Sequence, residues 1–257
     1  MLTKNMKNKI TILLMLISTI SYAQKTKKLK ENAGYGKAKF YVLKSDEVTK
    51  HGEYKITSYT PPFRNVVLGN YSNGKREGIW TEKYDQSGSQ IGIQGNYEND
   101  AKVGIWKYYN SKGKLLQEFD FDKNEFVSNS ECETENEFMV ETDGVIKTIK
   151  LTCPPTTIGG LQIFTKYLYR QITKKYPFEI NSSSRTTINI DETLSFFVSK
   201  DGNLENIEYS GKDENEELAK VIEDFLSENN DSWISGKLNN ENVRAKVSIP
   251  IRIRMMF

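Results

Sequence analysis

Few side chains in this chain have the types and spacing that catalysis requires. His51 is the only histidine, which excludes a metal site built on several histidines. A Ser-His-Asp triad would have to use His51 within a turn of an irregular repeat, and no Gly-x-Ser-x-Gly motif accompanies it. The carboxylates of Asp191-Glu192 are expected to end a polar loop, and those of Asp213-Glu214 to precede a helix N-terminus, where the helix dipole favours negative charge. These residues predict a protein that is not an enzyme and that has no metal and no cofactor. A binding function is therefore expected.

The start of the chain has the pattern of an export signal. Three lysines precede the apolar run Ile10–Ile20 and a small-residue cleavage site that ends at Ala23. The run is shorter than the roughly 20 residues of a membrane-spanning helix, so we expect a cleaved signal peptide over 1–23 and a periplasmic or secreted protein. An uncleaved short anchor is the alternative. Loss of the three lysines takes the formal net charge from +2 to −1, which argues against nucleic acid as a partner. The lysine-rich segment 25–30 is expected to be a solvated leader.

The cysteines Cys132 and Cys153 lie at equal distances from a predicted hairpin loop, Glu141–Gly144. An exported protein meets an oxidising compartment, where two cysteines usually pair. We therefore expect them to face each other across the hairpin ladder as a disulfide, which would stabilise the fold by about 3 kcal/mol. Two free thiols are the alternative, and a metal site is disfavoured because no other soft ligand is near.

The elements before the cysteines follow an internal repeat. Glycines recur every 26 residues, and each is followed two positions later by an aromatic residue, namely Tyr54, Trp80 and Trp106. Asn73-Gly74 is a strong turn signal, and each unit is predicted to be a β-hairpin. The aromatic ring of each unit is expected to pack over the glycine two residues before it. Stacked hairpins should form one antiparallel sheet with an aromatic ridge. These rings could form a ligand platform, although core packing is favoured. A weaker hairpin, Phe119–Phe126, follows.

This pattern resembles the MORN-repeat variant family, whose units carry a turn glycine, then Gly-x-Trp and a second tyrosine. The resemblance covers about residues 34–125, with two good copies and an irregular first one at His51–Tyr54. It implies a scaffold or an interaction surface. A connecting hairpin over 126–153 should separate it from the next domain.

The C-terminal part reads as α+β. Apolar residues at helical spacing predict a helix from Leu161 to Ile172 and another over Asn215–Ser227. Between them lie a strand at Leu194–Val198, the turn Asp201-Gly202 and a returning strand. From Val243 to Phe257 every second residue is apolar, which predicts a closing strand with one buried face. The expected fold class is thus a mainly β repeat sheet plus a small α+β domain with an antiparallel sheet and two helices.

Residues 154–257 resemble the C-terminal domain of the TonB energy-transducer family. The shared landmarks are Gly159-Gly160, Tyr176-Pro177, Asp201-Gly202, Trp233 and Ile249-Pro250-Ile251. Two departures are the missing proline after Trp233 and a long polar stretch over 178–191. A TonB protein also needs an anchor and a proline-rich arm, whereas this chain has six prolines in all. It is therefore not expected to couple to an inner-membrane motor in the ordinary way.

The TonB resemblance implies a peptide-binding strand. In that family the closing strand lies at a sheet edge and can accept an extended peptide. Pro250 lacks an N–H and fits such an edge. The cationic side chains could meet an acidic peptide, or could only protect the edge against aggregation. The candidate residues are Lys246, Val247, Ser248, Ile249, Ile251, Arg252, Ile253 and Arg254.

The sequence predicts an exported, non-enzymatic envelope protein that binds peptides or proteins through both domains. One candidate partner is a TonB-dependent outer-membrane receptor. Three alternatives stay open: a structural protein that associates with itself as a homo-oligomer, an atypical TonB-like transducer with an uncleaved anchor, and a hydrolase of envelope polymers, for which the residue inventory is poor.

Overall fold

The computed structural model of this protein describes residues 24–175, 187–211 and 215–256. The predicted signal peptide over 1–23, the Tyr176-Pro177 landmark and the carboxylate pair Asp213-Glu214 lie outside these residues. Within the described ranges, no helix is long and apolar enough to cross a membrane.

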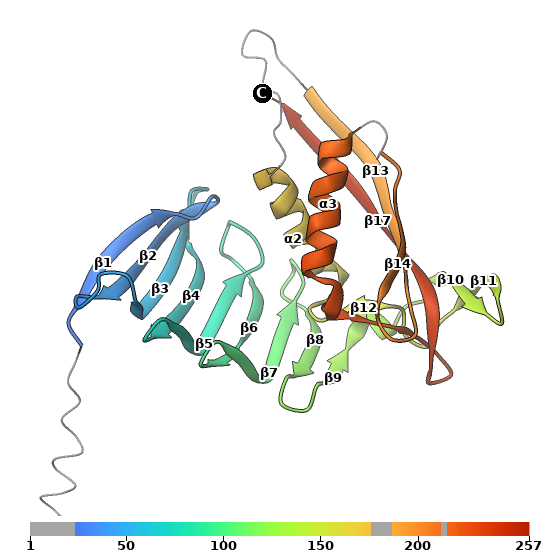
Figure 1. Ribbon diagram of the computed structural model, residues 1–257, viewed down its shortest axis with the longest axis horizontal. Coiled ribbons are helices and arrows are strands. Elements are labelled where there is room, and N and C mark those ends of the chain that lie inside the picture. The colour runs from blue at the N-terminus through green and yellow to red at the C-terminus, as the bar shows by residue number, and fades with distance from the viewer. Residues whose placement is uncertain (1–23, 176–186, 212–214, 257) are drawn as a thin grey trace, which may run out of the picture.

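Residues 26–129 form one antiparallel sheet in which each strand pairs with its neighbours in the sequence (Figure 1). This is the sheet that the 26-residue period predicts. It begins earlier than expected, because the lysine-rich segment is a strand that pairs with Gly36–Leu43 and is not a leader. In the described part of the chain its strands are β1 (Thr26–Asn32), β2 (Gly36–Leu43), β3 (Lys50–Ser58), β4 (Asn65–Ser72), β5 (Lys75–Lys83), β6 (Ile91–Glu98), β7 (Ala101–Tyr109), β8 (Leu115–Asp120) and β9 (Glu125–Asn129).

The repeat hairpins turn at residues that accept positive φ. Asn73 and Gly74 join β4 to β5 with φ of 49° and 87°, and Asn99 and Asp100 join β6 to β7 with φ of 52° and 74°. Two positive φ values in a two-residue loop are the type I′ pattern, whose twist matches that of the strands. The predicted hairpin turns are therefore confirmed.

Each repeat tryptophan lies across a glycine of the neighbouring strand. A Cβ built on Gly95 would lie 2.1 Å from the ring of Trp106, and one on Gly69 would lie 2.2 Å from the ring of Trp80. The prediction that each ring packs over the glycine two residues before it is wrong. Gly104 has nothing within 4 Å of its Cβ position, and it supplies a φ of 60° instead. Such a glycine lets β7 bulge, so that the ring of Trp106 can lie over Gly95 on the preceding strand, β6.

The aromatic rings form a continuous row along one face of the sheet. Adjacent ring centroids in this row are 4.9 to 6.1 Å apart, within the range of favourable aromatic pairs. The indole N–H groups of Trp80 and Trp106 donate to backbone carbonyls at 3.2 and 3.1 Å. The row, called the aromatic ridge below, comprises Phe40, Tyr54, Trp80, Tyr97, Trp106 and Phe121.

The C-terminal unit is a second antiparallel sheet with the strand order β11-β10-β17-β13-β14. Figure 1 shows two helices between this sheet and the repeat sheet, so that the molecule has three layers. The apolar faces of both helices pack on the second sheet as its core. The elements are the strands β10 (Glu137–Thr142), β11 (Val145–Lys150), β12 (Thr156–Thr157), β13 (Thr187–Val198), β14 (Leu204–Tyr209), β15 (Trp233–Ile234), β16 (Gly236–Leu238) and β17 (Glu241–Met256), the helices α2 (Gly160–Lys175) and α3 (Glu216–Glu228), and the 3₁₀ turns η1 (Ser130–Cys132) and η2 (Asn230–Ser232).

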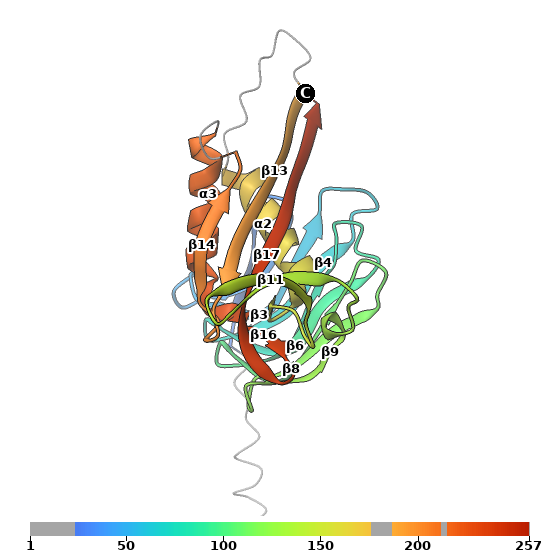
Figure 2. The same ribbon diagram turned by 90° about the vertical axis from the view of Figure 1, so that its right-hand side faces the viewer.

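The strand β13 is longer than the sequence predicts. Residues 187–191, expected to belong to a polar loop, pair with the last residues of β17 as a two-stranded ribbon (Figure 2). The pair Asp191-Glu192 therefore lies within a strand and does not end a loop. Ile190 lies opposite Ile253 in the ladder. The apolar residues of β17 continue in alternation as far as this ribbon, and pairing with them extends β13.

The Cys132–Cys153 disulfide is present, as predicted, with the two Cα atoms 4.1 Å apart. Its expected position across the hairpin ladder is wrong. Thr142 pairs with Val145, so the hairpin turns at two residues and not at four, and both cysteines lie beyond the ladder. Cys132 ends η1, and Cys153 forms a bridge with Lys237. The disulfide thus joins the exit of the repeat sheet to the second sheet.

We expect replacement of both cysteines by serine to lower the free energy of unfolding by about 3 kcal/mol, because the unfolded chain gains the entropy of an open loop. Urea denaturation followed by tryptophan fluorescence measures this loss. The double variant should be insensitive to dithiothreitol, whereas the unmodified protein should lose a similar amount when reduced. Equal stability of the oxidised and reduced protein would contradict the prediction.

Candidate functional site

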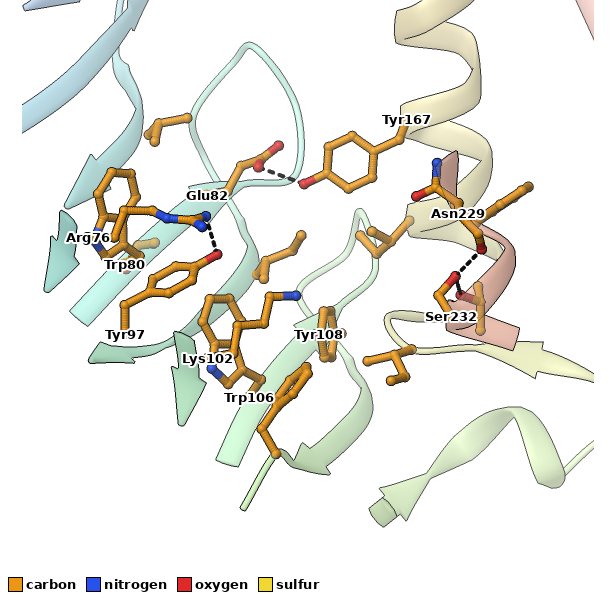
Figure 3. Close-up of a pocket in the computed structure, with 18 of the residues that line it drawn as sticks. Arg76, Trp80, Glu82, Tyr97, Lys102, Trp106, Tyr108, Tyr167, Asn229 and Ser232 are labelled. Atoms are coloured by element: carbon orange, nitrogen blue, oxygen red, sulfur yellow. Dashed lines mark hydrogen bonds between the residues drawn. The ribbon is translucent and has the colours of Figure 1, made fainter. Parts of the chain in front are cut away.

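A cleft of about 720 Å³ lies between the aromatic ridge and the helices α2 and α3 (Figure 3). Small-molecule sites usually have volumes of about 300–1,000 Å³ and mostly apolar walls with a few polar groups. This cleft has that composition. The sheet contributes Trp80, Tyr97 and Trp106, and the helical side contributes Ile163 and Phe164. The residues come from both halves of the chain, so the cleft exists only when the halves are packed together.

The carboxylate of Glu82 connects the repeat sheet to α2. It accepts hydrogen bonds from Lys166 Nζ at 2.9 Å, from the Tyr167 hydroxyl at 2.7 Å and from Arg170 at 3.3 Å. Burial acts to raise the pKa of Glu82, but the two cations outweigh it and hold that pKa below its usual range. Glu82 is therefore a charged anchor for the helix at one end of the cleft.

A second set of contacts fixes the N-terminal end of α2. The side chain of Gln117 on β8 is fully buried; it accepts a hydrogen bond from Gly159 N–H at 2.7 Å and donates to the Thr156 hydroxyl at 3.2 Å. Glu131 accepts from the N–H of Leu161 at 3.0 Å in the first turn of the helix. Buried polar groups with all partners in place define one arrangement, so these bonds set the position of α2 over the sheet.

Cations recur with the repeat and lie over the rings. Lys50, Arg76 and Lys102 are each 26 residues apart. The Lys50 ammonium is 4.8 Å from the ring centre of Phe40, the Arg76 guanidinium 4.0 Å from that of Tyr97, and the Lys102 ammonium 4.7 Å from that of Trp106. These distances are typical of cation–π contacts. The ridge is therefore covered by a row of positive charge, which the sequence analysis missed although the period shows it.

Lys102 differs from the other two cations because it has no acidic partner within the described residues. Arg76 pairs with Asp100 at 2.9 Å, and Lys50 lies 4.0 Å from Glu31. Packing around Lys102 lowers its pKa to about 8, and Arg76 adds to the effect. The side chain still reaches solvent, because it extends into the open space of the cleft (Figure 3). The sheet thus holds, at the cleft wall, an ammonium group that lies over the rings of Trp106 and Phe121 and pairs with no acid of the described residues.

The predicted repeat aromatics all lie on the ridge but differ in exposure. Trp106 is only 3% exposed and belongs to the core, whereas Tyr54 and Trp80 are half-buried and line the cleft. Trp106 is therefore mainly a core residue that also borders the cleft, and the other two contribute both to packing and to the cleft wall.

His51 has a structural role. It lies in β3 and not in a turn, and its Nδ1 accepts a hydrogen bond from Asn73 N–H in the next hairpin at 3.2 Å. Among the described residues, no group of three or more His, Cys, Asp or Glu side chains could hold a metal ion.

The closing strand β17 has one side open over most of its length. Its other side pairs with β13 from Ala245 to Met256, while β10 pairs only with Arg244 and Ala245. In an antiparallel ladder, alternate residues point their N–H and C=O groups to opposite sides. The backbone groups of even-numbered residues from 246 to 254 therefore point away from β13, where no strand of the described chain pairs with them.

The Tyr169 hydroxyl lies on this open side. It accepts a hydrogen bond from Arg252 N–H at 3.0 Å and donates to the Pro250 carbonyl at 3.0 Å. One hydroxyl thus occupies the two backbone groups that an added strand would use. Pro250 is at an outward position, so its missing N–H removes no bond to β13, which agrees with the constraint expected from the sequence.

The side chains of the predicted peptide-binding strand alternate in exposure. Val247, Ile249, Ile251 and Ile253 are at most 8% exposed and form the core. The cations lie on the opposite face, where Arg252 pairs with Asp191 at 3.1 Å and Lys246 with Glu208 at 3.2 Å. Ser248 and Arg254 are exposed beside them. The structure therefore brings these residues together on one strand, away from the cleft.

Comparison of the chain with protein-family models, with curated proteins and with solved structures finds no match.

Proposed function

We propose that this chain is a non-enzymatic binding protein of the cell envelope, which captures an extended segment of a partner protein by strand addition to β17. The observation that carries the proposal is the open side of β17 from Lys246 onward, where backbone groups in regular β geometry have no partner strand within the described residues. Backbone hydrogen bonds along such an edge supply affinity, and flanking side chains supply selectivity.

The resemblance of residues 154–257 to the TonB C-terminal domain supports the same mode of binding, since that family uses its closing strand in this way. Arg252 and Arg254 favour an acidic segment, and the plug end of an outer-membrane receptor is the candidate partner. In this proposal the MORN-like sheet is the scaffold that carries the binding domain.

The Tyr169 hydroxyl is the group that an incoming strand replaces. A peptide backbone would offer a carbonyl to Arg252 N–H and an N–H to the Pro250 carbonyl, in place of the hydroxyl. The exchange conserves the number of hydrogen bonds at this point and adds new ones at Ser248 and Arg254.

The test compares Ser248→Pro with Ser248→Ala. Proline removes the outward N–H of residue 248 and leaves the ladder with β13 intact, whereas alanine changes only an exposed side chain. We expect Ser248→Pro to lower partner capture about tenfold, the equivalent of about 1.4 kcal/mol, and Ser248→Ala to leave it unchanged. The measurement is in-cell crosslinking through a photoreactive residue at position 252, whose side chain is 73% exposed, followed by mass spectrometry.

Equal capture by both variants would refute strand addition. An open edge can also pair with the same edge of a second copy about a two-fold axis, which keeps self-association as the second candidate. Recovery of the chain crosslinked only to itself would identify an assembly role in place of partner capture.

A further inference from the structure

We propose that the cleft over the aromatic ridge binds a small organic carboxylate, whose apolar or aromatic body lies against Trp80 and Tyr97 and whose charge is bound by Lys102. This site is separate from the β17 edge, and the inference does not depend on strand addition.

The repeat itself explains why Lys102 is available. In the preceding unit, the equivalent cation Arg76 is neutralised by Asp100 at 2.9 Å. In the next hairpin the ring that follows Trp106 on the ridge is Phe121, 24 residues after Tyr97, so the 26-residue period ends here. Asp122, in the turn after β8, accepts a hydrogen bond from Gly104 N–H at 3.1 Å, and among the described residues it forms no ion pair with Lys102. Lys102 therefore lacks the acidic partner that Arg76 has.

The remaining charges of the cleft favour a single negative charge near Lys102. The Glu82 carboxylate is neutralised by the cations of α2. The Arg76 guanidinium pairs with Asp100 and donates to the Tyr97 hydroxyl at 2.7 Å. Glu228, at the α3 side, would repel a second anionic group. A monoanion matches Lys102, the cation that no acid neutralises among the described residues lining the cleft, whereas a dianionic phosphate would leave a charge unmatched in a site of low polarity.

The walls determine the rest of the ligand. On the sheet side the cleft is lined by Trp80, which is half-buried, and by Tyr97, which is 8% exposed, and Ile158, Ile163 and Phe164 line the opposite side. A flat or apolar body between such walls buries carbon surface on both faces. The expected occupant therefore has a carboxylate at one end and a hydrophobic body of drug-like size.

The test uses pyrene-1-butyrate, which has one carboxylate and a flat apolar body, and its neutral methyl ester. Binding to the full chain is measured by calorimetry and by quenching of tryptophan fluorescence, since Trp80 and Trp106 line the cleft. We expect the acid to bind at least tenfold more tightly than the ester, because a hydrogen bond to a charged group contributes about 1.5–3 kcal/mol. Equal binding of acid and ester would overturn the proposal.

Two substitutions locate the site. Lys102→Met keeps the length of the side chain and removes its charge, and it should weaken binding of the acid tenfold or more without changing that of the ester. Lys147→Met is the matched control on β11, at an exposed lysine away from the cleft, and should change nothing. Unchanged affinity in Lys102→Met, or an equal loss in Lys147→Met, would refute the assignment.

The pH dependence gives a readout that a structural role of Lys102 would not produce. Only the protonated amine attracts the anion, and its pKa in the empty cleft is about 8, so affinity should be full below pH 7 and fall by up to tenfold per unit above pH 8. Lys102→Arg keeps its charge and should bind the acid equally up to pH 9.5. A fall of the same size in Lys102→Arg would contradict the proposal.

The other charged or titratable groups around the cleft do not reproduce this profile. Burial raises the pKa of each of the tyrosines that face Lys102 from β6, β7 and α2, so they stay neutral over this range. The same holds for the tyrosines at the N-terminal strands, whose pKa values burial also raises. The groups concerned are Tyr35, Tyr54, Tyr71, Arg76, Glu82, Tyr97, Tyr108, Tyr167 and Glu228.

Discussion

Replacement of Glu82 by alanine is expected to lower the free energy of unfolding by about 3 kcal/mol, the lower end of the range for a buried ion pair, since it leaves two partly buried cations without their acid. The Lys166 side chain is 13% exposed and donates to Glu82 at 2.9 Å, and the Tyr167 hydroxyl loses its acceptor as well. Urea denaturation followed by tryptophan fluorescence measures the loss. Because Glu82 holds α2 over the repeat sheet, α2 should no longer be fixed in the same variant and the cleft should no longer form.

The control for this prediction is Glu135→Ala. Glu135 also pairs with a lysine, Lys150 at 2.6 Å, but its side chain is 92% exposed, so the loss should stay below about 1 kcal/mol. If Glu82→Ala loses no more than Glu135→Ala, the anchoring role of Glu82 is wrong.

The pH dependence of the same contact follows from the direction of its pKa shift. The pKa of Glu82 is lower in the folded protein than in the unfolded chain, so the stabilisation is present above about pH 4.3 and is lost as pH falls through the folded value. Glu82→Gln cannot titrate and should show a smaller decline of stability in that acidic range.

Replacement of Gly95 by alanine is expected to lower the free energy of unfolding by about 3–5 kcal/mol, as much as removing the ring of a buried tryptophan. The new Cβ would lie 2.1 Å from the Trp106 ring, which is 3% exposed and also donates to the Asn96 carbonyl at 3.1 Å. The ring would have to leave its place and give up both its packing and that hydrogen bond. Thermal or urea unfolding measures the loss.

Gly144→Ala is the matched control. Gly144 has a φ of 74° but nothing within 4 Å of its Cβ position, so alanine there should lower stability only through backbone strain, by about 1–2 kcal/mol. A double variant that also carries Trp106→Leu should show strong non-additivity, because the new Cβ then meets a smaller side chain. Equal losses in Gly95→Ala and Gly144→Ala would contradict the proposed clash.

The repeat sheet could be predicted because its determinants are local and periodic. Asn73-Gly74 specifies its own turn, and the repeated glycine and tryptophan positions indicate hairpins of constant length. The first strand was missed because the alternation in Thr26–Asn32 is hidden by lysines, and only pairing with β2 makes it a strand. The extension of β13 was missed for the same reason, since Ile190 acquires its place through Ile253.

The cleft could not be predicted because its walls come from distant parts of the chain. Glu82 and Lys166 are 84 residues apart, and no sequence period relates the helix to the sheet. Two signals were nevertheless present. Glu82 stands where the neighbouring repeats have Ile56 and Tyr108, and an acid in an apolar position indicates a polar partner. The cations at positions 50, 76 and 102 have the period of the tryptophans.

The strictly sequential strand order of the repeat sheet lets its length change by whole repeats. Helix α2 is attached near β5 and β8 through Glu82 and Gln117, and its Arg170 also lies 4.3 Å from the ring centre of Tyr35, between β1 and β2. A unit of 26 residues could be duplicated or deleted on the β1 side by a single in-frame event, which would leave β17 unchanged and alter the part of the cleft wall formed by Tyr35 and Tyr54. In such an architecture, one wall of the cleft can vary by inheritance of whole repeats while the strand β17 stays the same.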